Sequence, residues 1–424
     1  MVRETMDMAA RSMLWLESLT IHRFRNVKPG TRLEFNPGMN VLLGKNATGK
    51  TTLLELISHC IRSDFMRFLE EEFELEYVLR STEHRAIISV RNALQEGEAS
   101  GTSSTAGLTL FVTFHLDGKP APSLSSTGAR PQICFYEGEL FGRQDCFRFD
   151  EGLEAFSAIL NRVSDSSRAS IGSIPAASMT LLETSGHPFL RPPSGHQSLR
   201  GSVFSSQEGP NDGLGQFESF FMPSELRERL LADFSGDDER IDARLMERDL
   251  KFLKDAVQLL DFHKGQVRAE VLDAMQGRAK KTLGNLRFWL SHRCEPPVPV
   301  DRLSYGQKRL FAFIYYLHCN PEIVIADELT NGMHHDWIRD VVKRLEGRQS
   351  FLATQNPLLL DYLQFQSPEQ VRSTFIQCQL KKGRGKKPEM IWAPLEVEDA
   401  ERFYRSYESG GQYVSEILIV KGLW

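Results

Sequence analysis

The chain has 424 residues, enough for one large domain or two to three ordinary ones. Its apolar share of 41% is sufficient for a buried core, and a formal net charge of −5 excludes a global positive field that would draw the protein onto nucleic acid. Because no run of about 18 apolar residues occurs, we expect no membrane span and a cytoplasmic protein.

The first strands are predicted around a glycine-rich loop. Leu16–Ile21 alternates apolar and polar residues, and Pro29 with Gly30 breaks the pattern. Met39–Leu43 is a short apolar run typical of a buried strand, and Thr51–Ile57 follows the loop with the pattern of a helix. Strand, loop and helix therefore come in the order that a phosphate-binding loop requires.

Beyond this loop the patterns change several times. Residues 75–93 and 107–117 alternate as strands do and predict an antiparallel sheet. Leu and Phe at helical spacing predict helices at Glu247–Leu260 and Arg268–Leu290. Near the C-terminus we expect a hairpin whose tip, Lys381–Lys387, is basic and either meets nucleic-acid phosphates or is a solvated turn.

These patterns divide the chain into five expected segments. In chain order they are a disordered lead-in (1–13), an N-terminal lobe (14–160), a flexible Ser/Gly/Pro-rich insertion (161–222), a helical insertion (223–293) and a C-terminal lobe (294–424).

The strongest motif is G-x-x-x-x-G-K-T after the Met39–Leu43 strand. A glycine-containing turn before a helix presents backbone N–H groups to a phosphate. Lys50 is expected to reach the β- and γ-phosphates of ATP, and the hydroxyl of Thr51 is expected to bind Mg²⁺. The predicted nucleotide-binding residues are Gly44, Lys45, Asn46, Ala47, Thr48, Gly49, Lys50, Thr51 and Thr52.

A second motif is the apolar run Ile323–Ala326, which ends in Asp327 and Glu328. At the carboxyl edge of a parallel sheet, these acids would lie beside the phosphates. Asp327 suits the shell of Mg²⁺, and Glu328 suits polarisation of the attacking water.

A third motif, Leu303–Arg309, reads Leu-Ser-Tyr-Gly-Gln-Lys-Arg and precedes an apolar helix. Ser304, Gly306 and Gln307, with the start of that helix, can direct hydrogen-bond donors at a γ-phosphate.

These three motifs, with Leu303–Arg309 shortly before the Asp327-Glu328 strand, resemble those of ABC-type ATPases of the RecF/SMC/OLD branch. This branch includes AAA-type proteins of bacterial defence and repair loci. The resemblance implies an α/β ATPase head with a mixed parallel core sheet, an antiparallel subdomain and a helical insertion. The long insertion between Lys50 and Leu303 is unlike a compact transport motor.

Further segments fit the same branch. Leu19–Asn26 resembles its opening strand, which implies that Arg23, Arg25 or Asn26 touches phosphate or adenine; a solvated strand end is the alternative. Asn331–Trp337 is similar to its D-loop, so Asn331 or His334 is expected at a partner's site. The neighbouring histidines His334 and His335 are not expected to share one face or to bind metal.

The segment Ser350–Pro357 resembles the switch strand of the branch, with Gln355 where histidine is usual. Glutamine can hydrogen-bond the γ-phosphate or the lytic water but carries no charge, which bears on the rate of hydrolysis and not on binding. We therefore assign catalysis to Glu328 and Gln355.

The resemblance also implies partners. Two heads would enclose ATP, each nucleotide held by one loop and by Ser304–Gln307 of a second copy, so we expect a homodimer or higher oligomer. In a defence system resembling Septu, PARIS or retron ATPases, the dimer would regulate a nuclease or toxin effector. A RecF-like DNA-repair ATPase is the alternative. Intrinsic nuclease activity is not expected, because the acidic turn Glu396–Glu401 reads as a helix start.

Overall fold

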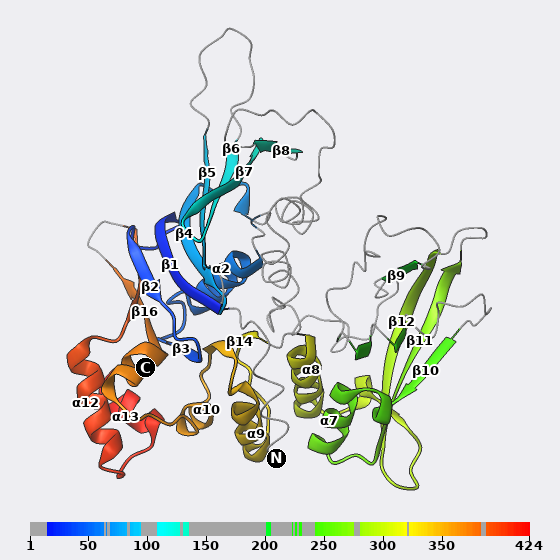
Figure 1. The fold of residues 1–424 in the computed structure, drawn as a ribbon. Helices are drawn as coiled ribbons and strands as arrows, with labels where there is room; N and C mark the ends of the chain where they lie inside the picture. The colour runs from blue at the N-terminus through cyan, green and yellow to red at the C-terminus, as the bar shows by residue number, and fades with distance from the viewer. Residues whose placement is uncertain are drawn as a thin grey trace. The chain divides into compact units, whose positions relative to one another are not determined.

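The structure is a computed structural model that forms two compact units (Figure 1). The first unit is drawn from residues 1–178, 322–328 and 345–424, and the second from residues 179–321 and 329–344. The residues that the structure describes are 15–62, 65, 68–82, 85–94, 108–127, 130–134, 201–204, 223, 225–226, 229–230, 242–274, 280–319, 322–382 and 387–424.

Three predicted segments fall wholly or largely outside these residues. They are the lead-in 1–13, the Ser/Gly/Pro-rich insertion 161–222 except for residues 201–204, and the central part of the basic hairpin tip, 383–386.

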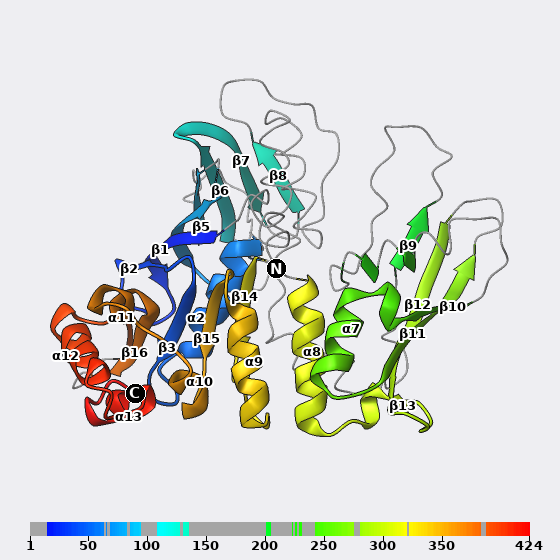
Figure 2. The same ribbon diagram turned by 60° about the horizontal axis from the view of Figure 1, so that its bottom comes forward.

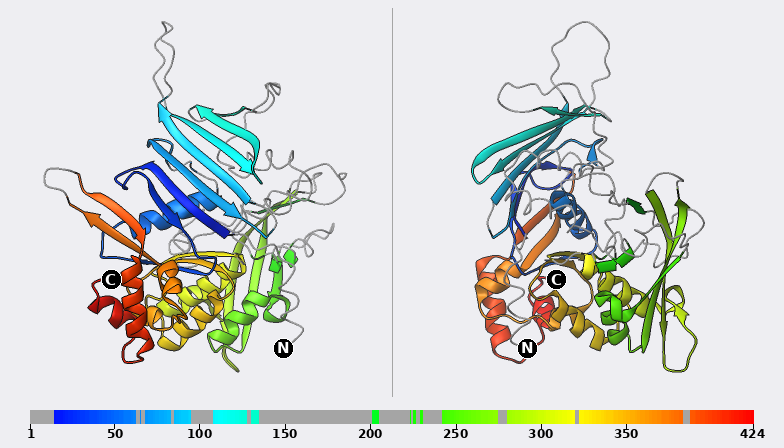
Figure 3. Two further views of the ribbon diagram at one scale, coloured as in Figure 1. Left: turned by 60° about the vertical axis from the view of Figure 1, so that its left-hand side comes forward. Right: turned by 45° about the vertical axis from the view of Figure 1, so that its right-hand side comes forward.

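An antiparallel sheet forms the first layer of the first unit, and its strands run side by side in Figure 3. Within the described residues its seven strands follow the order β2-β1-β4-β5-β6-β7-β8. In β4, Phe73, Leu75 and Tyr77 are buried and the glutamates between them are not. This period of two is the reason the segment is a strand. The predicted antiparallel sheet is confirmed. Its strands are β1 (Trp15–Phe24), β2 (Thr31–Glu34), β4 (Phe73–Arg80), β5 (Arg85–Leu94), β6 (Leu108–Leu116), β7 (Lys119–Thr127) and β8 (Arg130–Cys134).

A mixed sheet forms the second layer and carries the predicted phosphate loop. In the described part of the chain its order is β14-β15-β3-β16-β17, with the first four strands parallel and β17 antiparallel to β16. The strands β3 and β15 are almost wholly buried because the sheet is covered, which explains their unbroken apolar runs. The expected mixed parallel core is confirmed. The strands are β3 (Met39–Leu43), β14 (Ile323–Asp327), β15 (Gln349–Ala353), β16 (Phe375–Lys381) and β17 (Glu389–Pro394).

Helices cover this sheet. The helix α2 (Lys50–Arg62) packs against β14 and β15, and α11 packs against β3 and β16. The helices of the C-terminal region lie beside one another in Figure 2. They are α10 (Pro357–Asp361), α11 (Pro368–Thr374), α12 (Val397–Glu408) and α13 (Val414–Val420). The acidic turn at residues 396–401 is the start of α12, as predicted.

The second unit contains an antiparallel sheet and three helices among its described residues. The strands are β9 (Gly201–Phe204), β10 (Asp242–Met246), β11 (Lys264–Ala274), β12 (Lys280–Ser291) and β13 (Val298–Pro299). The helices are α7 (Lys251–Leu259), α8 (Tyr305–Cys319) and α9 (His335–Leu345), with short 3₁₀ turns at Glu247–Asp249 and Val300–Arg302. No helix in the described ranges is long and apolar enough to cross a membrane.

The predicted helix Arg268–Leu290 is wrong, because this segment forms most of the β11–β12 hairpin. Phe288 and Leu290 are buried on alternate positions, and Val267 pairs directly with Phe288. The burial therefore has a period of two, and the charges between the apolar residues had suggested a helical period. The helix predicted at Glu247–Leu260 is confirmed as α7 with the 3₁₀ turn before it.

An aromatic cluster joins α7, α8 and β12 in the second unit. The ring centroids of Phe252 and Tyr315 are 5.3 Å apart, and those of Phe288 and Phe311 are also 5.3 Å apart. Beside this cluster His318 hydrogen-bonds Asp255 at 3.0 Å. Burial opposes ionisation of Asp255, yet His318 and Arg344 together hold its pKa below the ordinary value. The helix that follows the third motif is thus fixed by packing and by charge.

Gln349 joins the two sheets of the first unit. Its amide Oε1 accepts from Leu16 N at 2.8 Å, and its Nε2 donates to Leu16 O at 2.8 Å and to Asn36 O at 3.0 Å. The side chain is 1% exposed. Two buried backbone groups of Leu16 and the half-buried carbonyl of Asn36 therefore depend on one amide for these hydrogen bonds.

Replacing Gln349 with leucine should lower the free energy of unfolding by about 2–4 kcal/mol, because buried donors and acceptors lose their partners. The matched control is Gln379→Leu on an exposed strand position, expected to change stability by less than about 0.5 kcal/mol. Urea unfolding followed by circular dichroism measures both. Equal midpoints for the two variants would contradict the prediction.

Candidate functional site

The loop after β3 folds back so that the side chain of Lys50 reaches carbonyl groups of the loop itself. Gly44, Ala47 and Gly49 have φ values of 150°, 64° and 89°, in or beyond the left-handed region. Lys50 begins α2 and is 8% exposed, and its Nζ donates to Gly44 O at 2.7 Å and to Lys45 O at 3.0 Å. Successive turns of this kind form a concavity of backbone N–H groups that receives an anion.

Two glycines of the loop have no room for a side chain. A Cβ added to Gly44 would lie 2.2 Å from the carbonyl oxygen of Cys378, and one added to Gly49 would lie 2.3 Å from Sδ of Met390. Both neighbours belong to the β16–β17 hairpin. The loop therefore packs directly on that hairpin, and glycine is required for space as well as for conformation.

The predicted metal pair is in contact. Thr51 donates its hydroxyl to Oδ2 of Asp327 at 2.6 Å, from the first turn of α2 to the end of β14. Glu328, the next residue, has φ of 51° and donates its backbone N–H to Ala353 O at 2.8 Å. This left-handed residue turns the chain away from the sheet at the edge where the phosphate loop lies.

Gln355 links the loop to the carboxylates. Its Nε2 donates to Oδ1 of Asn46 at 2.8 Å, and its backbone N–H donates to Oε2 of Glu328 at 3.2 Å. The two residues predicted to be catalytic are therefore in contact with each other and, through Asn46, with the phosphate loop.

A cavity of about 470 Å³ opens over these groups. It brings together ten of the predicted site residues and three apolar residues that the sequence did not single out. The lining residues are Asn26, Asn46, Ala47, Gly49, Lys50, Thr51, Thr52, Asp327, Glu328, Gln355, Leu380, Pro388 and Met390.

Arg25 is not among the residues that line the cavity. Its guanidinium makes two hydrogen bonds of 2.7 Å to Glu71 and stacks over the ring of Phe24 at 5.1 Å. The hydrogen bond to Glu71 raises the pKa of Arg25, and the same bond lowers that of Glu71. Arg23 forms an ion pair with Glu72. Of the three residues expected from the opening strand, the structure brings only Asn26 to the cavity.

The third motif lies in the second unit, at the start of α8. Ser304 Oγ accepts from the backbone N–H of Gln307 at 3.4 Å, and the side chain of Gln307 accepts from Ser304 N at 3.1 Å. This reciprocal pair is a capping box. Ser304 and Tyr305 are exposed. The motif therefore presents a capped helix start at a surface.

The turn with Asn331 packs on the same helix start. A Cβ added to Gly306 would lie 2.3 Å from Gly332 O, and Arg309 donates Nε to Leu329 O at 2.9 Å. Asn331 itself is exposed. The two segments that the family resemblance assigns to a partner contact are therefore one packed surface within the second unit.

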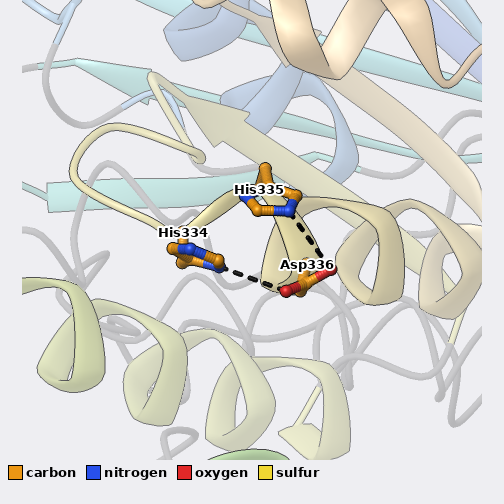
Figure 4. A group of neighbouring side chains, drawn as sticks. All are labelled: His334, His335 and Asp336. Carbon is orange, nitrogen blue, oxygen red and sulfur yellow. Dashed lines mark ion pairs between the residues drawn. The ribbon is translucent and has the colours of Figure 1, made fainter.

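His334, His335 and Asp336 follow this turn at the start of α9 (Figure 4). The two histidine rings are 4.1 Å apart at their centroids, and each lies 3.4 Å from an oxygen of Asp336. The expectation that neighbouring histidines cannot share one face is wrong here, because the two rings lie beside each other and one Asp336 carboxylate, at the start of the helix, contacts both. All three side chains are more than half exposed to solvent.

A comparison with family models identifies the class of domain. Residues 39–361, more than half of the chain, match a family model described as AAA domain, putative AbiEii toxin, Type IV TA system. The chain belongs to this AAA domain family. The match begins at β3 and ends at α10, so it includes the phosphate loop, the third motif, both carboxylates and Gln355.

A curated relative of this AAA domain protein is the DNA replication and repair protein RecF of Streptococcus pneumoniae. It is 44% identical over 71 residues, which cover 15% of this chain and 19% of RecF. The chain thus spans about a fifth of the length of the curated relatives it matches.

Solved structures include an SmcHead bound to the C-winged helix domain of ScpA, with 12% identity, 91% and 99% of the two chains covered and a TM-score of 0.41. The SMC head domain from Thermotoga maritima is 11% identical, with 90% of this chain and 99% of that chain covered and a TM-score of 0.39. The recombination mediator protein RecF with ATPrS is 15% identical, with 91% of this chain and 99% of that chain covered and a TM-score of 0.35.

The cavity residues missed by sequence reasoning are Leu380, Pro388 and Met390. Leu380 lies in β16, Met390 lies in β17 and Pro388 comes just before β17, a hairpin that the sequence had singled out only for its basic tip. The available signal was the strand β16 itself, because parallel strands end at one edge of a sheet and β16 is parallel to β3.

Replacing Gly49 with alanine should raise the Kd for ATP about tenfold or more, since the backbone strain of about 1–3 kcal/mol adds to a clash with Met390. The matched control is Gly410→Ala, which has a similar φ of 69° but nothing within 4 Å of the added Cβ. It should keep the affinity of the parent protein. Isothermal titration calorimetry with ATP and Mg²⁺ separates the two outcomes.

Proposed function

We propose that this AAA domain protein is an ATP-dependent switch that binds Mg²⁺-ATP in the loop of its first unit and dimerises around it. The observation that carries the proposal is the hydrogen bond between Thr51 and Asp327 at the edge of the sheet. It joins a hydroxyl at the start of α2 to a carboxylate from a distant part of the chain, directly beside Lys50. A phosphate loop with this partner has the components of a nucleotide site.

The residues fit Mg²⁺, because a hydroxyl and a carboxylate are the oxygen ligands that this ion takes beside a phosphate. Thr51 and Asp327 would hold it. When bound, the ion would neutralise the charge that develops on the β- and γ-phosphates. Residues of the chain itself would position the attacking water.

Glu328 and Gln355 suit the positions that orient a water molecule for attack. The carboxylate can accept a proton or a hydrogen bond from water, and the Gln355 amide, held by Asn46, can donate to a phosphate oxygen or to the water. An amide stays neutral, so it stabilises developing charge less than a protonated histidine would. Because Gln355 stands where histidine is usual in ABC-type ATPases, we expect slow hydrolysis of ATP.

The exposed start of α8 suits the other half of the site. Ser304 is exposed, and the N-terminus of a helix favours an anion. By its resemblance to ABC-type ATPases, this surface would meet the γ-phosphate held by a second copy of the chain. ATP would then bridge two copies and ADP would not, which makes the nucleotide a switch for assembly.

In the Glu328→Gln variant, binding of ATP should persist while hydrolysis falls about 100-fold or more, because the residue that orients the water loses its charge. The variant should elute as a dimer with ATP and as a monomer with ADP on a sizing column. Adding Ser304→Arg should return it to monomer without loss of ATP binding. A monomer of Glu328→Gln at saturating ATP would refute the sandwich and leave binding intact.

Two cellular processes could use such a switch. In the first, the chain regulates a separate nuclease or toxin effector in bacterial anti-phage defence; the family description, which names a putative AbiEii toxin, supports this class. In the second, it is a RecF-like DNA-repair ATPase that binds DNA; the 71-residue match to RecF supports that class. We favour the first, because the family model matches residues 39–361 and the match to RecF covers only 71 residues.

DNA binding separates the two processes. If the chain acts in repair, replacing Lys381, Lys382 and Lys387 with glutamine should weaken duplex DNA binding and reduce the slope of log K against log salt by about 3. The matched control replaces the exposed lysines Lys251, Lys254 and Lys264. Fluorescence anisotropy at several salt concentrations measures both. If the parent protein does not bind DNA but co-purifies with an effector, the result supports the defence function.

A further inference from the structure

The order of strands gives the cavity two different sides. The phosphate loop follows β3, which lies between β15 and β16 in the sheet. Asp327 ends β14, Glu328 follows it, and Gln355 follows β15, so both acids and the catalytic amide come from one side of β3. The β16–β17 hairpin lies on the other side. All four parallel strands end at the same edge, where the cavity opens.

The side formed by the hairpin is apolar. Leu380 and Met390 are cross-strand partners in the β16–β17 ladder, and Pro388 comes just before β17. All three line the cavity. They contribute no charged or hydrogen-bonding side chain, in contrast to the acids and amides on the opposite side. Such a division is typical of ligand sites in which a few polar groups fix one end of the ligand.

This apolar wall is held in place by the turn after β1. Asn26 donates its Nδ2 to Pro388 O at 2.9 Å and accepts from Met390 N at 2.8 Å through its carbonyl oxygen. Lys28 N donates to Met390 O at 2.9 Å. Met390 is 8% exposed and lies against Gly49 of the phosphate loop. The wall is therefore fixed relative to the place where phosphates would bind.

The nucleotide can occupy the cavity in one direction. Its γ-phosphate must lie toward Thr51 and Asp327 if these hold the metal, and toward Glu328 if this residue orients the water. The nucleoside then extends to the opposite side of β3. Arg25, which the opening strand offered as a contact for adenine, is bonded twice to Glu71.

We infer that Leu380, Pro388 and Met390 form the wall against which the base of the bound nucleotide lies. This inference rests on the proposed binding of ATP at the same loop. Contact of apolar side chains with the face of a base is favourable for any base, because it removes apolar surface from water. A thioether adapts its shape to such a ring and is polarizable. The hairpin thus recognises the nucleoside, and the loop recognises the phosphates.

The test compares ATP with inorganic tripolyphosphate, which has no base. For Met390→Ala, and separately for Leu380→Ala, the Kd for Mg²⁺-ATP should rise about tenfold, the scale set by removing one buried apolar side chain from a contact. The Kd for tripolyphosphate should stay within a factor of about two of the parent value. Isothermal titration calorimetry of the full chain measures both ligands.

Ile391→Ala is the matched control, because Ile391 is the next residue of β17 and is absent from the cavity wall. It should bind both ligands like the parent protein. Parent-like ATP binding by both wall variants would overturn the inference, as would equal loss of ATP and tripolyphosphate by both. If the parent chain binds neither ligand, the proposed nucleotide site itself fails, which is a different result.

Discussion

The site depends on the parallel hydrogen-bonded ladder in which β3 lies between β15 and β16. Residues 39–43 pair with residues that come more than 300 positions later, so the ladder joins the two ends of the motif set. Because the strands are parallel, their carboxyl ends share one edge. The phosphate loop, the carboxylates and the apolar hairpin meet at that edge for this reason.

The sequence was sufficient for the parts of the site that follow from local chemistry. The loop after Met39–Leu43, the acids after Ile323–Ala326 and the capped start of α8 each have a spacing that a phosphate site requires. The convergence of the loop and the acids in the first unit, shown by the contact between Thr51 and Asp327, could be expected once a parallel sheet was assumed. The antiparallel sheet was predicted by alternation alone.

The sequence was insufficient where a contact depends on the partner of a side chain. Nothing in Leu19–Asn26 shows that Arg25 is bonded to Glu71, because that glutamate lies outside the segment, just before β4. The segment Arg268–Leu290 has apolar residues at spacings that satisfy both a helix and a strand, and pairing with its neighbour decided the outcome. Leu380 and Met390 gained a role only from the register of a hairpin.

The close packing of Gly306 on Gly332 has a consequence for how the surface of the second unit can change. A Cβ added to Gly306 would lie 2.3 Å from the facing carbonyl oxygen, so no larger residue fits at this position unless the turn at Gly332 moves. The start of α8 and the turn after Glu328 therefore constrain each other's residues. A partner surface that includes both segments could therefore change at Gly306 only together with the turn at Gly332, through paired substitutions and not through single ones.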